Sequence, residues 1–216
     1  TIKMAMATMT SRVLGLVREL VMASQFGASG LTDAYNVAFR IPNILRDLFA
    51  EGAFSSAFVP VFVEVHKKDP KKARSLLWSV FIILVVATGL ICVGIINFAP
   101  ELIQMFTSSK FTENEERFSV TVTLLRIMAP FLSLVSIAAL FMGALNTLKI
   151  FFVPSLAPAF FNVVMICSMF FLPPILQARG VPTILALGFG VVAGGLAQLL
   201  VQIPLIFKKN LSPKGP

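Results

Sequence analysis

The stretch that decides the fold of this chain runs from Thr10 to Val63 and reads TSRVLGLVRELVMASQFGASGLTDAYNVAFRIPNILRDLFAEGAFSSAFVPVFV. It is apolar enough to enter a lipid bilayer, yet it carries charged side chains along its whole length. These are Arg12, Arg18, Glu19, Asp33, Arg40, Arg46, Asp47 and Glu51. A charged side chain at the bilayer centre costs roughly 2.5–3.5 kcal/mol on insertion scales, so such residues face protein or water and mark functional sites.

The composition outside this stretch is that of a membrane protein. The 216 residues are 57% hydrophobic and only 13% charged, whereas roughly a quarter of the residues of a soluble domain carry charge. Cys92 and Cys167 lie in separate apolar runs, so neither a disulfide framework nor a metal site is indicated. The net charge of +8 does not indicate a nucleic-acid partner, because the basic residues do not gather on one soluble, aromatic-rich face.

Apolar runs of about 20 residues, the length that crosses a bilayer as a helix, recur throughout the chain. They predict an all-α integral membrane fold in which six transmembrane helices form one domain. The expected spans cover about residues 4–26, 33–63, 75–98, 118–147, 153–173 and 183–207. The second and fourth are longer than a straight crossing needs. Each contains a proline, Pro42 or Pro130, where we expect a kink because proline lacks the backbone donor.

The basic residues set the expected orientation in the membrane. The loop from His66 to Arg74 reads HKKDPKKAR, and the positive-inside rule places such a short, strongly basic loop in the cytoplasm. With six crossings, both ends of the chain then face the cytoplasm, and the loop from Phe98 to Phe118 lies outside. Ten of the 18 basic residues fall on the cytoplasmic side: Lys3, Lys67, Lys68, Lys71, Lys72, Arg74, Lys149, Lys208, Lys209 and Lys214.

Helical geometry groups the polar residues of the first two spans. At about 100° per residue, one stripe of the second span consists of Asp33, Asn36, Arg40, Asn43, Asp47 and Glu51, with Arg46 on its flank. On the first span, Arg12 and Arg18 are separated by about 120° around the helix axis and about 9 Å along it. Both can therefore line one cavity at different heights.

Four more side chains complete the expected cavity. Glu19 lies nearly on the face of Arg12 and can orient either arginine, and Ser11 adds a hydroxyl at the same level. Asn43 on the second span and Asn162 on the fifth add amides. On the sixth span, Gln198 and Gln202 are one turn apart and are expected to face other protein rather than lipid.

The arginines indicate an anionic ligand. The spans hold five arginines against at most five acids, several of them near the interfaces, so pairing alone does not account for them. The planar guanidinium stays protonated and donates two parallel hydrogen bonds to a phosphate. We therefore expect a water-filled cavity that binds a phosphate-bearing ligand. Two alternatives stay open: a scaffold whose charges are all internal pairs and, last, an intramembrane enzyme, for which no metal cluster or activated serine is evident.

Several separated segments resemble one known family. They are SRVLGLVRE at Ser11–Glu19, TDA at Thr32–Ala34, RIPNILR at Arg40–Arg46 and FAEGAFS at Phe49–Ser55, with weaker similarity at Gly143–Thr147 and from Pro154 to Asn162. In this order and spacing they resemble the MurJ (MviN) family of lipid II flippases, part of the superfamily of multidrug and oligosaccharidyl-lipid exporters. The resemblance covers most of the chain. It leaves open the alternative of another exporter of the same superfamily, for drugs or for a lipid-linked oligosaccharide such as the O-antigen lipid.

The resemblance implies transport of lipid II, the undecaprenyl-pyrophosphate-linked peptidoglycan precursor, from the cytoplasmic to the outer leaflet of the bacterial inner membrane. Family members surround a cationic cavity with two lobes and work by alternating access. Arg12, Arg18 and Arg46 match the substrate-binding arginines of the family, and Asp33, Glu51 and Glu19 match its acidic positions.

The resemblance also sets the expected partners. The chain matches the N-terminal lobe alone, so a C-terminal lobe is an expected partner, together with lipid II and membrane lipids. No cofactor is expected in this chain, and membrane potential or an ion gradient would drive transport.

Overall fold

The computed structural model describes residues 2–27 and 30–213, and for residues 50–55 it describes the backbone alone. The described residues form helices and short connections, with no strand among them, which confirms the all-α prediction. The first half consists of α1 (Ile2–Phe26), α2 (Gly30–Arg46), the π-helical segment η1 (Asp47–Gly52), α3 (Ala53–Lys68) and α4 (Pro70–Asn97). The second half consists of α5 (Ala99–Phe106), α6 (Ser109–Thr112), α7 (Glu115–Met128), α8 (Phe131–Thr147), α9 (Phe152–Ala178), α10 (Leu185–Leu200) and α11 (Ile203–Lys208).

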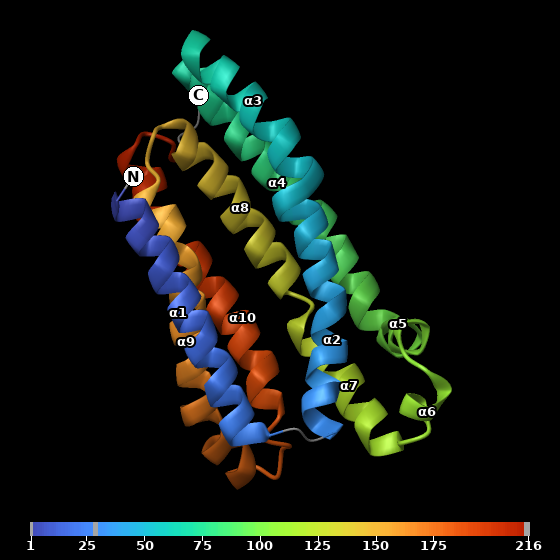
Figure 1. Ribbon diagram of the computed structural model, residues 1–216. Coiled ribbons are helices and arrows are strands. Elements are labelled where there is room, and N and C mark those ends of the chain that lie inside the picture. Colours follow the sequence, from blue (N-terminus) through green and yellow to red (C-terminus); the bar gives the residue numbers. More distant parts are fainter. Residues whose placement is uncertain (1, 28–29, 214–216) are drawn as a thin grey trace.

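The helices form two groups joined through α7, α8 and α10. In one group α1 packs along α9, and α9 packs along α10. In the other, α2 packs on α7 while α3 and α4 pack on each other and on α8 (Figure 1). Because α10 contacts both α7 and α8, it connects the two groups. The start of α1, the α8–α9 turn and the α3–α4 turn lie at the same end of the molecule (Figure 1).

Small residues allow α9 and α10 to pack closely. A Cβ atom built on Gly194 would lie 2.7 Å from a ring carbon of Phe161, and one on Gly190 would lie 2.8 Å from the sulfur of Met165. Real Cβ atoms do not approach other atoms so closely. At Gly194 the ring and the backbone oxygen of Phe161 leave no room for a Cβ atom, whereas at Gly190 the side chain of Met165 would have to shift. The pair has the spacing of the GxxxG motif, which brings helix backbones together in lipid. The ring of Phe161 therefore lies against α10, and it also lines the cavity described below.

The chain is interrupted at the predicted proline in the fourth span. Pro130 has no backbone N–H, and α7 ends at Met128 before α8 begins at Phe131. Side chains from α4 support the interruption: the thiol of Cys92 donates to the carbonyl of Ala129 at 2.9 Å. Nearby, the Ser133 hydroxyl donates to Thr88 Oγ1 at 2.9 Å.

The second span behaves differently at its proline. α2 continues through Pro42 without a break, and the irregular segment is η1, which begins at Asp47. A π-helical segment places an extra residue in the turn and is found often at functional sites. Together α2, η1 and α3 form one long helical run from Gly30 to Lys68 (Figure 1).

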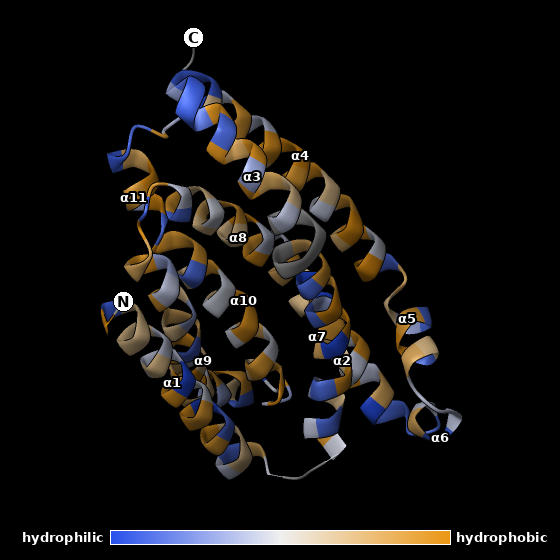
Figure 2. Ribbon diagram, turned by 45° about the horizontal axis from the view of Figure 1, so that its top comes forward, coloured by the Kyte–Doolittle hydropathy of each residue, from blue (hydrophilic) through white to orange (hydrophobic). Residues whose placement is uncertain are grey.

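Four helical segments of the described residues are long and apolar enough to cross a membrane. They are Pro70–Asn97, Glu115–Thr147, Phe152–Ala178 and Leu185–Lys208. The first two predicted spans are not among them. α1 carries Arg12, Arg18 and Glu19 within its length, and the run of α2, η1 and α3 includes residues 50–55, for which only the backbone is described. Figure 2 shows polar residues alternating with apolar ones on α1 and α2.

Candidate functional site

A cavity of about 450 Å³ lies where the two groups of helices meet. Its walls come from α1, α2, α8, α9 and α10, so residues from both ends of the sequence contribute. Its apolar walls include Phe39, Phe131, Phe161 and Met142. Its polar lining consists of Arg18, Asn43, Arg46, Asn162, Gln198 and Gln202. The volume lies in the range of about 300–1,000 Å³ that is typical of small-molecule sites.

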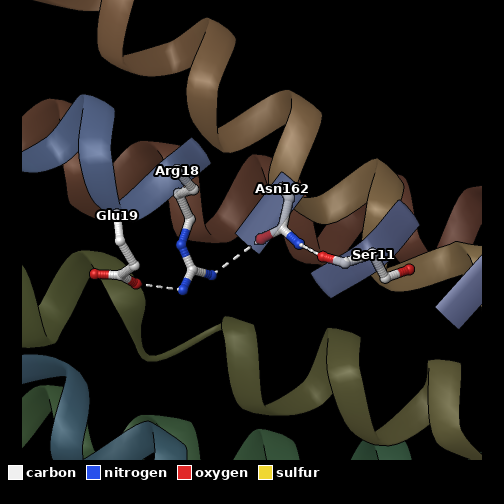
Figure 3. A network of polar contacts seen from close by, with 4 residues as sticks. All are labelled: Ser11, Arg18, Glu19 and Asn162. Atoms are coloured by element: carbon white, nitrogen blue, oxygen red, sulfur yellow. Dashed lines mark hydrogen bonds and ion pairs between the residues drawn. The ribbon is translucent and has the colours of Figure 1, made fainter. Parts of the chain in front are cut away.

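Arg18 is the best-held cation of the cavity. Its Nη1 donates to Asn162 Oδ1 at 3.1 Å and its Nη2 donates to Glu19 Oε1 at 2.5 Å (Figure 3). The guanidinium carbon lies 5.9 Å from the ring centre of Phe161, a distance at which a cation interacts favourably with an aromatic face. With 27% of its side chain exposed, Arg18 is held in place and can still meet a ligand.

Asn162 on α9 links the side chain of Arg18 to the backbone of α1. It is buried on α9, and its Nδ2 donates to the carbonyl of Ser11 on α1 at 3.1 Å (Figure 3). The Ser11 hydroxyl donates to the carbonyl of Ala7 at 3.0 Å and approaches that of Ser155 at 3.4 Å. These contacts join α1 to α9 and orient Arg18 towards the cavity.

Arg46 is the second cation of the cavity and comes from the last turn of α2. Its Nε and Nη2 both donate to Asp47 Oδ1, at 3.2 and 2.8 Å. The helix presents Arg46 and Asn43 to the cavity because its other face is buried against α7. That face is formed by Ala34, Ala38 and Ile41, which repeat at helical spacing and are buried.

The remaining predicted site residues whose side chains are described lie outside the cavity lining. Arg12 is exposed on α1 and makes no hydrogen bond or ion pair with any other described residue. Glu19 and Ser11 contact Arg18 and α9 from behind the lining. Asp33 is exposed in the first turn of α2. The side chain of Glu51 lies outside the described residues.

Two kinds of lining residue were not among the predicted site residues. Gln198 and Gln202 were expected to face protein, and the structure shows that they line the cavity itself. Their signal in the sequence was the presence of two amides one turn apart in an otherwise apolar helix. The phenylalanines had no comparable signal, because aromatic residues are common in all the spans.

The lining favours an anionic ligand with several oxygens. Two guanidinium groups reach one cavity from α1 and α2, with amides on the other helices. No carboxylate lines the cavity among the described residues, and each arginine pairs instead with the acid that follows it in sequence, Glu19 or Asp47. Arginine forks bind phosphate oxygens in pairs, and they do so best when partly shielded from water.

Comparison with known proteins identifies the family. The sequence pattern of the family described as "Lipid II flippase MurJ" matches residues 22–215. The chain belongs to the MurJ lipid II flippase family. The resemblance noted in the motifs of the first two spans is thereby confirmed.

Individual MurJ proteins match nearly the whole chain. The lipid II flippase MurJ of Burkholderia cenocepacia is 40% identical over 207 residues, which are 95% of this chain and 39% of that protein. The probable lipid II flippase MurJ of Vibrio cholerae is 38% identical over 94% of this chain and 39% of its own length. This chain therefore spans about two fifths of the length of the MurJ proteins that it matches.

A solved MurJ structure shares the fold. "Lipid II flippase MurJ, inward closed conformation" superposes with a TM-score of 0.74 at 28% identity, covering 96% of this chain and 42% of the other. Together with the four helices long enough to span a bilayer, membership of the MurJ family makes the chain a multi-pass protein of the bacterial inner membrane.

Proposed function

We propose that this chain is the N-terminal, six-span lobe of a lipid II flippase and that its cavity binds the pyrophosphate of lipid II. The convergence of Arg18 and Arg46 on one cavity is the observation that carries the proposal. The two residues come from different helices, and each is about a third exposed or less on its side chain. They can therefore clamp one anion from two sides.

Binding would proceed by exchange of partners. In the absence of ligand, Glu19 and Asp47 neutralise the two arginines. Both carboxylates are about half exposed, so they can turn to water when a pyrophosphate takes their place. Asn162 keeps its contact with Arg18 throughout and holds the guanidinium in position. The doubly charged ligand then gains charge-assisted hydrogen bonds from preoriented donors.

The other predicted residues have roles in a transport cycle. We assign Arg12 and Asp33 to surfaces that the ligand or a further lobe contacts when the cavity opens and closes, because both are exposed. Asn43 supports the ligand beside Arg46. Since the chain spans about two fifths of its relatives, a C-terminal lobe would complete the alternating-access machine, driven by membrane potential or an ion gradient.

The membrane orientation follows from the basic residues. Lys67, Lys68, Lys71 and Lys72 are exposed at the α3–α4 turn, which Figure 2 shows as strongly polar. The start of α1 and the α8–α9 turn lie at the same end (Figure 1) and carry Lys3 and Lys149. The positive-inside rule assigns this end to the cytoplasm.

The test is lipid II exposure on the outer leaflet of cells depleted of their own flippase. The cells carry the full-length gene for this protein, either unchanged or with Arg18→Ala or Arg46→Ala, at matched membrane abundance. We expect the unchanged gene to restore exposure and both substitutions to abolish it. Arg40→Ala is the matched control, because Arg40 lies on α2, is exposed and does not line the cavity. Normal exposure with both cavity substitutions would refute the phosphate site.

A structural scaffold is the second candidate, because both cavity arginines have an acidic partner. That function predicts that the substitutions lower membrane abundance and stability while transport per molecule is unchanged. A drug exporter for cationic compounds is disfavoured, because such a cavity needs acidic residues and the described lining has none.

A further inference from the structure

Gln202 presents a hydrogen-bond acceptor that nothing in the described structure satisfies. The residue lies between α10 and α11, lines the cavity and is only 1% exposed. Its Nε2 donates to the carbonyl of Ala138 at 3.1 Å and to that of Gln198 at 3.3 Å. Its Oε1 is buried and has no donor among the described residues.

The orientation of this amide is fixed by its neighbours. Carbonyl oxygens only accept hydrogen bonds, so the side of the amide that faces Ala138 and Gln198 must be the NH₂ group. The oxygen is therefore directed away from both carbonyls. The backbone is held as well, since the carbonyl of Gln202 accepts from the N–H groups of Leu205 and Ile206 at 3.2 and 3.3 Å. Rotation of the Gln202 side chain therefore does not bring its Oε1 to another donor.

A buried acceptor in this state calls for a donor from outside the chain. Buried polar side-chain atoms in native proteins are nearly always hydrogen-bonded, because an unpaired one loses its interactions with water. Because Gln202 is one of the residues that line the cavity, a ligand bound there can supply the donor. The cationic part of the cavity offers only donors, on Arg18 and Arg46, and suits phosphate. Gln202 Oε1 is an acceptor instead, and it suits a hydroxyl or an amide N–H of the ligand.

We propose that Gln202 Oε1 accepts a hydrogen bond from a hydroxyl or amide N–H on the sugar next to the pyrophosphate of the ligand. This inference rests on the proposed function. The cavity then recognises two chemical features of the ligand. Arg18 and Arg46 bind its negative charge, and Gln202 binds a neutral hydrogen-bond donor. A lipid pyrophosphate without a sugar satisfies only the first, so Gln202 makes the site selective for glycosylated lipid pyrophosphates.

The test compares two ligands on the same purified full-length protein in lipid nanodiscs. One ligand is lipid II, and the other is undecaprenyl pyrophosphate, which carries the charge and the tail but no sugar. The main variant is Gln202→Met, which keeps the length of the side chain and removes the acceptor. We expect its affinity for lipid II to fall about tenfold, as for one lost hydrogen bond in a buried site, and its affinity for undecaprenyl pyrophosphate to change less than about twofold.

Measuring both ligands on one sample separates recognition from folding, because a smaller folded fraction lowers both binding amplitudes equally. If Gln202→Met does not fold, Gln202→Asn keeps the amide but withdraws it by one methylene, and a smaller selective loss is expected. Ser136→Ala is the matched control: Ser136 is buried on α8 with an unpartnered hydroxyl but does not line the cavity. It should leave both affinities unchanged.

Three results would overturn the proposal. Equal losses for both ligands would show that Gln202 only supports the fold, and unchanged affinities would show that a water satisfies its oxygen. If the unchanged protein binds neither ligand, or if Arg18→Ala weakens neither, the proposed function fails and this inference fails with it. A selective loss for lipid II in Gln202→Met, beside a loss for both ligands in Arg18→Ala, supports both.

Discussion

Arg18 and Asn162 lie 144 residues apart in the sequence and are joined by a 3.1 Å hydrogen bond from Nη1 to Oδ1. The amide nitrogen of Asn162 uses its own hydrogen to bind the carbonyl of Ser11 at 3.1 Å. One buried side chain thus both attaches α1 to α9 and sets the direction of the guanidinium (Figure 3). The position of the cation and the packing of the two helices depend on the same residue.

Replacing Asn162 should therefore affect both stability and transport. Asn162→Leu removes a hydrogen bond to a charged group and one to a backbone carbonyl, so we expect a loss of about 2 kcal/mol in the free energy of unfolding. Thermal unfolding in detergent measures the first effect, and lipid II exposure per molecule measures the second. Asn97→Ala is the control, because Asn97 is exposed and bonds only the carbonyl of Val93 on its own helix. Equal stability of the two variants would contradict the role given to Asn162.

Gly194→Ala should disturb the cavity by displacing Phe161, one of its lining residues. The new Cβ atom would lie 2.7 Å from a ring carbon of Phe161 and 3.0 Å from its carbonyl oxygen. Since backbone cannot yield as a side chain can, we expect a loss of about 1–3 kcal/mol. Because Phe161 lines the cavity beside Arg18, ligand affinity should fall as well. Gly89→Ala, on α4 with open space around it, is the control and should be neutral or slightly stabilising.

Thr88→Val tests the support of the α7–α8 interruption. Valine has nearly the shape of threonine, so the main change is the loss of the hydroxyl that accepts from Ser133 at 2.9 Å. Thr88 is fully buried, so Ser133 would lose its acceptor and we expect the unfolding free energy to fall by about 1 kcal/mol. The double variant Thr88→Val with Ser133→Ala should lose less than the sum of the single changes. Strict additivity would show that the two hydroxyls do not interact.

The proposed orientation can be tested by labelling single cysteines in intact cells. In a background without Cys92 and Cys167, Lys68→Cys at the α3–α4 turn should react only with a reagent that crosses the membrane. Lys110→Cys, in α6 at the opposite end, should also react with an impermeant reagent. Both lysines are exposed, so access to solvent is matched between the two sites. The reverse pattern would invert the topology.

Much of this protein is determined by its sequence alone, because lipid imposes strong and local rules. Long apolar runs must be helices in a bilayer, since only internal hydrogen bonds can satisfy their backbone. Pro130 lacks a donor, so an interruption was predictable at that residue and is present. Charges in Thr10–Val63 had to face protein or water. The family was also evident from motifs that lie in this stretch, with weaker similarity between residues 143 and 162.

Tertiary structure decided which of these residues share a cavity. Helical periodicity placed Arg12 and Arg18 about 120° apart, and it could not state which of the two directions faces α9. The packing of α1 on α9 and the hydrogen bond from Arg18 to Asn162 fix how α1 is turned about its axis. Arg18 therefore lines the cavity and Arg12 does not. Likewise, the two carbonyls that orient Gln202 include one on α8, 64 residues away in the chain. Such contacts depend on how helices pair, and pairing is a property of surfaces that a local sequence pattern does not contain.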